Sequence, residues 1–583
     1  MPSPTPSPAS LSLPVIELGT TLIILALALC FPRTGASLFV RVEGLLGRLA
    51  RKRGLSIFIA GAGACLLRLL LFPISPIPKP WIQDDFSFLL AADTFAHGRL
   101  TNPTPAMWTH FESFHITLKP TYMSMYFPAQ GLVLAVGQVI AGHPWWGVWA
   151  SCGLMCAAIC WMLEGWLPSG WALLGAMLAV LRLATFSYWI NTYTGGAVSA
   201  IGGALVLGAL PRILPNAHNA FAVRLRGFRA RDFFWMALGL AILANSRPYE
   251  GLLVSLPSLA VLGWQLWKRP HPGIFVLIRR MAPAAVLLIA TLGFMGYYNY
   301  RVFGSPFIPP YRVNRDTYTS APYFIWQSAR PEPVYRHTAI RNFYTGWELK
   351  TFREETGSIA GFLSESGKKL LEIGSFYLSF TLIPPLVMLP WAFRDKRIRF
   401  LTATAIVLAL GLGIETFFRP HYLAPATALL IALLLQSMRH LRARGRSGLM
   451  LVRSIPVACV LLALVRICAQ PLHIELASPL KQAGTWAGGT PESGQTRARV
   501  LAELERQPGQ QLAVVRYPND HLYPEWVYNA AEIDKSKVVW AREMDPESNR
   551  QLLDYYKGRK AWLVEPDCNP PRVIPYPGKG AGP

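Results

Sequence analysis

The chain has 583 residues, of which 52% are hydrophobic and only 15% carry a charge. Because soluble globular proteins carry about 25% charged residues, this composition does not fit a large water-soluble enzyme, a collagen-like chain or a disordered chain. The formal net charge of +24 would suit nucleic-acid binding if the basic residues formed one patch. They are spread instead in short clusters between apolar runs, so we expect a membrane protein with no nucleic-acid partner.

Apolar runs of roughly 17 to 23 residues recur along the chain, and a helix of that length crosses a hydrocarbon core about 30 Å thick. The pattern predicts a polytopic α-helical membrane protein with about twelve spans. A further apolar run at residues 131–142 is too short to cross and is expected to form a re-entrant or interfacial helix. The predicted spans cover residues 14–31, 55–74, 145–166, 170–190, 193–211, 232–245, 250–267, 281–300, 371–393, 400–417, 421–437 and 449–469.

Clusters of Lys and Arg between these spans set the orientation, because cytoplasmic loops concentrate both residues. The spans alternate without conflict if all the clusters are cytoplasmic, and three large segments then lie on the extracytoplasmic face of a bacterial inner membrane or a plasma membrane. These segments are residues 75–144, 301–370 and 471–583. The chain is thereby divided into an N-terminal span with a basic cytoplasmic loop (1–54), a transmembrane domain (55–470) and an extracytoplasmic tail (471–583).

The tail loses the apolar pattern and is predicted to be a small α/β domain. It has no Gly-rich phosphate loop and no metal-ligand spacing, so we expect it to stabilise the protein or to contact the acceptor. Its predicted elements are helices at 496–506 and 545–556 and strands at 512–517, 537–542 and 561–566.

Two adjacent carboxylates, Asp84 and Asp85, follow the second predicted span in the stretch WIQDDF (81–86). Neighbouring carboxylates repel, which raises the pKa of one of them unless a cation or a hydrogen-bond donor compensates. Such a pair suits a general base or a ligand for a divalent metal. It would equally cap the N-terminus of a helix through the free backbone N–H groups, and the residues alone leave these alternatives open.

Longer stretches around this pair carry a resemblance to a known family. They are WIQDDFSFLLAADTFAHGRLTNP (81–103) and YFPAQGLVLAVGQVIAGHPWW (126–146), with shorter ones in NTYTGGA (191–197), NSRPYEG (245–251), YNYRVFGSPFIPPY (298–311) and RPHYLAP (419–425). Over residues 50–470 the sequence resembles the GT-C superfamily of membrane glycosyltransferases, which includes protein O-mannosyltransferases and lipid A aminoarabinose transferases. The resemblance implies a polyprenyl-phosphate-linked sugar donor and an active-site carboxylate at Asp84 or Asp85.

The chemistry implied by this resemblance needs a base for the acceptor hydroxyl and cations for the leaving phosphate. One of the two aspartates would be the base, and we favour Asp84. Arg247, in NSRPYEG, and Arg419 with His421 are expected to bind the donor phosphate, because guanidinium matches phosphate geometry. Each arginine would otherwise snorkel to the membrane interface, and Glu250 could neutralise Arg247.

Further candidates are less specific. Lys119, Tyr126 and Arg301 are secondary site candidates in the outer segments. The segment Met125–Pro128 departs from the family pattern, which often has a basic residue before Tyr-Pro-Pro, so one phosphate contact is missing. The stretch HFESFH (110–115) could join Asp84 at a metal, but its spacing matches no standard zinc motif. We therefore assign no metal ligand and expect no required cofactor.

Two functions follow from the sequence. The first is a glycosyltransferase that moves a hexose or pentose from the lipid carrier to a lipid, glycan or protein acceptor, with inversion at C1 in a single displacement. The alternative is a transporter or flippase for a lipid-linked glycan, in which the same charged residues would line a pathway. Internal repeats with paired broken helices would favour transport, and none is evident in the sequence.

Overall fold

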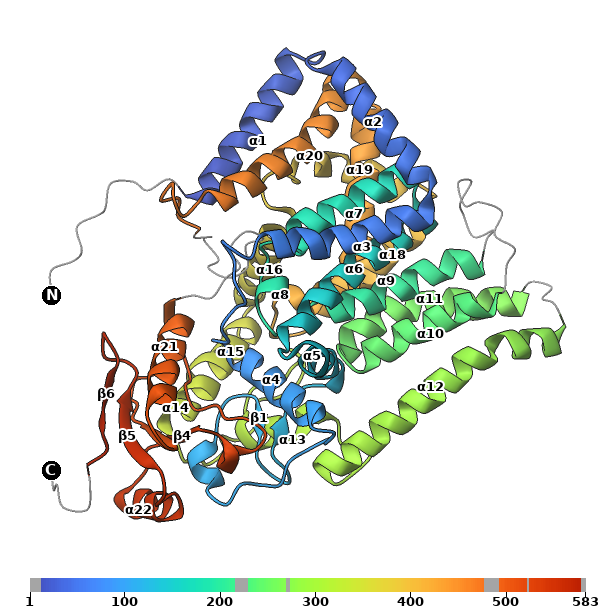
Figure 1. Cartoon of the computed structure of the whole chain (residues 1–583). Coiled ribbons are helices and arrows are strands. Elements are labelled where there is room, and N and C mark those ends of the chain that lie inside the picture. Colours follow the sequence, from blue (N-terminus) through green and yellow to red (C-terminus); the bar gives the residue numbers. More distant parts are fainter. Residues whose placement is uncertain (1–11, 215–228, 269–272, 477–491, 522–523, 578–583) are drawn as a thin grey trace.

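The computed structural model describes residues 12–214, 229–268, 273–476, 492–521 and 524–577. The described chain is mostly helical, with a small sheet near its C-terminal end (Figure 1). Residues 1–11, which belong to the predicted N-terminal domain, and Arg224 and Arg226 of one basic cluster lie outside the described residues.

Six described helical segments are long and apolar enough to cross a membrane, which makes the chain an integral membrane protein. They are α1 (Leu13–Cys30), α3 (Arg53–Leu70), α6 (Trp145–Trp166), α12 (Ile274–Phe303), α19 (Thr427–Arg442) with the 3-10 turn Pro420–Ala426 before it, and α20 (Gly445–Ile467). Other helices pack among them, and these are α7 (Ser169–Leu183), α9 (Ala197–Ile213), α10 (Ala230–Ala244), α11 (Pro248–Lys268) and α18 (Arg399–Gly413).

The predicted count of twelve spans is not confirmed, and the segment 371–393 is where prediction and structure differ most. That segment is a broken path: α16 (Ile359–Ile373) runs into the π-helical turn Gly374–Leu378, and then a 3-10 turn leads to α17 (Leu389–Arg394). Ser379 has a φ of 53°, a left-handed conformation that ends a helix, and Pro384 and Pro385 follow shortly after it. Hydropathy counts these residues as apolar, but the backbone cannot continue as one helix.

The apolar run predicted not to cross forms α5 (Pro128–Ala141). At 1.5 Å per residue its 14 residues reach about 21 Å, less than the thickness of the hydrocarbon core. The helix nevertheless keeps Val136, Val139 and Ile140 exposed on one side. An amphipathic helix of this length fits an interfacial position.

The two predicted outer loops contain the elements that surround the site. The first holds α4 (Gln83–Ala96) and the two-stranded pair β1 (Ile116–Thr117) and β2 (Met123–Ser124) before α5. The second holds α13 (Pro310–Tyr318), α14 (Thr338–Arg341) and α15 (Lys350–Thr356) before α16.

The tail has the α/β elements that its sequence predicts, and one strand that it does not. It comprises α21 (Glu492–Arg506), β3 (Gln511–Val515), β4 (Val538–Arg542), α22 (Pro546–Tyr555), β5 (Lys560–Glu565) and β6 (Arg572–Pro575). The strand order is β4-β3-β5-β6, in which β3 pairs in parallel with β4 and β5, and β6 is antiparallel to β5.

These three segments pack on one another at one end of the helices, in the lower part of Figure 1. Phe86 of α4 stacks on Tyr528 of the tail, with ring centroids 4.2 Å apart and planes within 7°. Phe114 of the first loop contacts Phe343 of the second loop, with centroids 4.4 Å apart.

The helix α2 (Ala36–Arg51) connects α1 to α3 away from that end, at the upper right of Figure 1. Its Glu43 forms ion pairs with Arg453 of α20 at 2.9 Å and with Arg442 at the end of α19 at 3.5 Å, which fix α2 against these two helices. The orientation of the chain across the membrane stays a prediction from its basic clusters.

Candidate active site

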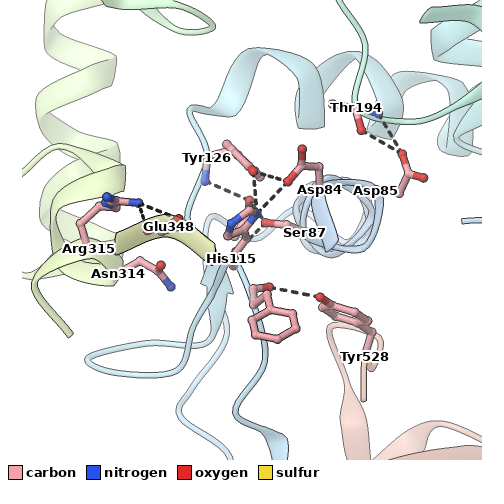
Figure 2. Close-up of polar contacts among 12 residues, drawn as sticks. Asp84, Asp85, Ser87, His115, Tyr126, Thr194, Asn314, Arg315, Glu348 and Tyr528 are labelled. Carbon is pink, nitrogen blue, oxygen red and sulfur yellow. Dashed lines mark hydrogen bonds and ion pairs between the residues drawn. The ribbon is translucent and has the colours of Figure 1, made fainter. Parts of the chain in front are cut away.

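The first turn of α4 directs its two aspartates to different surroundings. Successive residues of a helix point about 100° apart, so adjacent side chains cannot share a partner easily. Asp84 faces the turns that flank β1 and β2, whereas Asp85 faces the loop before α9 (Figure 2). Both carboxylates lie near the free N–H groups of a helix start, which favour negative charge.

Asp84 is held by two side chains from the first loop. Its Oδ1 lies 2.7 Å from Nδ1 of His115 and accepts the hydroxyl hydrogen bond of Tyr126 at 2.5 Å. Burial alone would raise the pKa of Asp84, but the hydrogen bond and charge of His115 and the bond from Tyr126 outweigh it and lower the pKa to about 2. Asp84 is therefore ionised at neutral pH, and among the described residues no hydrogen bond reaches its Oδ2.

His115 keeps its position at the expense of backbone strain. Its φ of 59° is left-handed, which is uncommon for a residue other than glycine and is often found at functional sites. The hydroxyl of Ser87 holds this backbone by donating to the carbonyl of His115 at 2.7 Å. The Tyr126 hydroxyl also lies 2.8 Å from the His115 Nδ1, so Asp84, His115 and Tyr126 form one hydrogen-bonded group.

Asp85 joins α4 to the loop that precedes α9. Its Oδ1 accepts hydrogen bonds from the backbone N–H groups of Tyr193 and Thr194, at 2.8 and 3.1 Å, and from the Thr194 hydroxyl at 3.0 Å. The side chain is buried, and burial raises its pKa to about 6 in spite of these donors. Gly195 follows with a φ of 72°, a turn that allows the two N–H groups to converge on one oxygen.

A cavity of about 270 Å³ lies beside Asp84. Asp84, His115 and Tyr126 line it, and Asp85 does not. Three arginines, Arg247, Arg315 and Arg419, line the same cavity with His421, so an ionised carboxylate and several guanidinium groups face one space. The rest of its described wall includes many aromatic side chains, among them Tyr188, Tyr249, Tyr311, Tyr323, Phe324, Trp347, Phe417 and Tyr422.

The predicted phosphate-binding residues differ in how far they are already paired. Arg419 is 55% exposed and lies 3.1 Å from Glu372. Arg247 lies over the ring of Tyr422, 4.0 Å from its centroid, and 3.5 Å from Glu250, so the neutralising partner that the sequence suggested is present. The Nδ1 of His421 bonds to the hydroxyl of Tyr188 at 3.0 Å.

Two secondary candidates lie outside the cavity wall. Lys119 is exposed, with its Nζ 3.9 Å from the ring centroid of Trp108, and Arg301 on α12 bonds to the Tyr297 hydroxyl at 2.9 Å. Tyr126, the third secondary candidate, is part of the Asp84 group. The structure therefore brings Tyr126 to the site and leaves Lys119 and Arg301 on the surface.

The metal set suggested by HFESFH is dispersed. His110 bonds to the backbone carbonyls of Arg542 and Ser548, and Glu112 accepts the hydroxyl bond of Tyr318 at 2.9 Å. Within the described ranges, no group of three or more His, Cys, Asp or Glu side chains is placed to hold a metal ion. Only His115 of this stretch reaches Asp84.

The sequence did not identify several cavity residues. Arg315 of α13 forms a buried ion pair with Glu348 at 2.9 Å, and both residues line the cavity. The sequence shows a basic and an acidic residue 33 positions apart in one predicted outer loop, but nothing in it indicates that the two side chains pair. His115 was noted only as a metal candidate, because its contact with Asp84 depends on the turn between α4 and β1.

The fold and the cavity together define an integral membrane protein with a polar site built at one end of its helices. No protein-family model matches the chain, and no curated protein matches it. Among solved structures the chain is similar, at low identity, to the proteins described next.

One is the archaeal oligosaccharyltransferase of Archaeoglobus fulgidus. Its complex with Zn and sulfate is 11% identical to this chain, covers 88% of this chain and 67% of its own, and has a TM-score of 0.46. The complex of AglB from this organism with an inhibitory peptide and a dolichol-phosphate is 11% identical, covers 88% and 69%, and has a TM-score of 0.44.

Another is ArnT from Cupriavidus metallidurans in the apo state. It is 12% identical, covers 87% of this chain and 92% of its own, and has a TM-score of 0.42. The function proposed below rests on the residues of the site.

Proposed function

We propose that the protein is a glycosyltransferase that moves a sugar from a polyprenyl-phosphate carrier to an acceptor hydroxyl at the extracytoplasmic face of a membrane. The observation that carries this proposal is the ionised Asp84, which shares one cavity with Arg247, Arg315 and Arg419. Transfer from a sugar phosphate needs an acceptor for a proton and cations for the leaving oxygen, and this cavity offers both.

Asp84 would orient and deprotonate the acceptor. Its Oδ1 is occupied by His115 and Tyr126, so Oδ2 accepts the hydrogen bond of the incoming hydroxyl. A carboxylate with a pKa near 2 is a weak base at the start of the reaction. The acceptor oxygen becomes strongly acidic as it bonds to C1 of the sugar, and Asp84 then takes its proton.

The cations would stabilise the phosphate as the bond from C1 to the phosphate oxygen breaks. Arg419 is the most exposed of the three arginines that line the cavity, and it is best placed for a lipid phosphate that arrives from the membrane. Arg247 and His421 lie in the same wall. A single displacement of this kind inverts the configuration at C1, because the acceptor attacks opposite the leaving phosphate.

The proposal is tested with membranes that contain the protein and polyprenyl phosphates carrying a radiolabelled sugar. We expect label to move from the carrier to an acceptor with the wild-type protein, and Asp84→Asn to abolish this transfer. Movement of intact lipid-linked glycan across the bilayer without cleavage would support the flippase alternative. Equal transfer by wild type and Asp84→Asn would contradict the role of the carboxylate.

A further inference from the structure

The cavity wall contains two carboxylates that the transfer chemistry does not use. Glu250, in the first turn of α11, is 3% exposed, and Glu415, in the loop after α18, is 7% exposed. Both side chains line the cavity together with Asp84. A carboxylate buried to this extent is costly unless hydrogen-bond donors surround it.

Those donors are missing for one oxygen of each residue. Among the described residues, Oε1 of Glu250 and Oε2 of Glu415 are buried and have no hydrogen-bond partner. The cations nearby do not fill the gap: Arg247 approaches Glu250 only to 3.5 Å. Lys369 bonds to the carboxylate of Glu355 at 2.8 Å and to the backbone carbonyl of Glu415, so its charge is already shared.

Each of the other carboxylates of the cavity has a charged or hydroxyl partner, although the buried Oε2 of Glu372 also lacks a hydrogen bond among the described residues. Asp84 has His115 and Tyr126, Glu348 has Arg315, and Glu372 has Arg419. Glu250 and Glu415 lie close enough to each other on one side of the wall for their charges to interact. Tyr422 is within electrostatic reach of both Glu415 and Asp84, so this side belongs to the same compartment as the proposed reaction.

We propose that Glu250 and Glu415 form a subsite that binds hydrogen-bond-donating groups of the transferred sugar, either hydroxyls or an ammonium. The inference rests on the proposed function. A sugar offers O–H or N–H donors on its rim and an apolar C–H face, and the aromatic side chains beside the two carboxylates, such as Tyr249 and Phe324, suit that face. Bound there, the sugar would supply the donors that the two oxygens lack.

The test is equilibrium binding to the purified full-length chain in nanodiscs. The three probes are polyprenyl phosphate alone, polyprenyl phosphate carrying glucose, and the same lipid carrying glucosamine. The variants are Glu250→Gln and Glu415→Gln, with Glu354→Gln as a matched control, because Glu354 is a half-exposed glutamate outside the cavity.

We expect a sugar to increase the affinity of the wild-type chain over that for the bare lipid phosphate, and each cavity variant to lose roughly tenfold of that gain. Affinity of Glu415→Gln for bare lipid phosphate and the behaviour of Glu354→Gln should stay within about twofold of the wild type. Glu250→Gln should bind bare lipid phosphate no more weakly than the wild type, because Arg247 loses its carboxylate partner. If hydroxyls are bound, glucose gives the gain and glutamine retains part of it. If an ammonium is bound, only glucosamine gives the gain, and salt weakens it.

Thermal melting of the ligand-free variants separates binding from folding. Removing a buried carboxylate that lacks donors should leave the melting temperature unchanged or raise it, whereas loss of a structural residue would lower it. A sugar-dependent gain that survives in the double variant, or that is absent for both sugars in the wild type, overturns the subsite alone. Failure of the wild type to bind even bare polyprenyl phosphate overturns the proposed function together with the subsite.

Discussion

The two sides of the first turn of α4 show how differently one residue type behaves in neighbouring positions. Asp84 faces a cavity, bonds to side chains and has a pKa lowered to about 2. Asp85 is enclosed, bonds mainly to backbone N–H groups and has a pKa raised to about 6. The hydrogen-bond partners of each carboxylate, and not its position beside the other one, therefore decide which aspartate is suited to react and which is structural.

The different roles of the two aspartates are tested most directly by replacing each of them with asparagine. Loss of a positioned carboxylate lowers rates by about 10² to 10⁴-fold, so Asp84→Asn should lose transfer by that factor. Asp85→Asn should keep transfer within about tenfold, because an amide oxygen can still accept from Tyr193 and Thr194. The measurement is kcat/KM for transfer from the lipid carrier. Equal losses in both variants would contradict the division of roles.

The cations offer the next largest effect. Losing one charge-assisted contact in a low-dielectric site costs about 2 to 4 kcal/mol of transition-state stabilisation, and we expect Arg419→Ala to show this cost in kcat/KM. Arg247→Ala should lose less, because Glu250 and Tyr422 already engage that guanidinium. Arg301→Ala, outside the cavity, serves as the control. Full activity in both cavity variants would show that neither arginine holds the phosphate.

A third prediction concerns the hydrogen-bond partners that lower the pKa of Asp84. Tyr126→Phe removes one donor to Asp84, which raises the carboxyl pKa from about 2 toward its ordinary value. We expect the acid limb of kcat/KM to shift to higher pH, while the rate at neutral pH changes little because Asp84 stays ionised in both proteins. Tyr335→Phe, which removes a hydroxyl outside the cavity lining, is the matched control. An unmoved acid limb would mean that this hydroxyl does not tune Asp84.

The smallest effect concerns stability at the enclosed side. Because the folded-state pKa of Asp85 is raised to about 6, its contribution is complete below the ordinary pKa near 3.8 and is lost as pH rises through 6. A shift of about two units corresponds to about 3 kcal/mol at most. Asp85→Asn stays neutral, so its melting temperature should fall less than that of the wild type between about pH 4 and pH 7. If the melting temperatures of the wild type and Asp85→Asn change with pH in parallel, Asp85 does not cause the pH dependence of stability.

The elements with strong local patterns were predictable from the sequence. The apolar runs at 55–74 and 145–166 correspond to α3 and α6, and the tail strands at 512–517 and 537–542 correspond to β3 and β4. The Asp84–Asp85 pair was predictable as a feature, since two carboxylates opening an apolar helix are visible in the sequence alone. In each case the information lies within about 20 neighbouring residues.

Features that depend on distant contacts were not predictable. The pairing of Asp84 with His115 joins positions 31 apart, and that of Arg315 with Glu348 joins positions 33 apart through a π-helical turn. The break at Ser379 was hidden because hydropathy does not report backbone conformation. The edge strand β6 was missed because its four residues include a proline and are too few to form a pattern.

The stacking of Phe86 on Tyr528 couples the folding of two distant parts of the chain. Phe86 lies one residue after Asp85, and Arg497 covers its ring at 4.5 Å from the centroid, so the tail supports the first turn of α4. A substitution that unfolds the tail should therefore also loosen the turn that holds Asp84 and Asp85, even though it lies more than 400 residues away in the sequence.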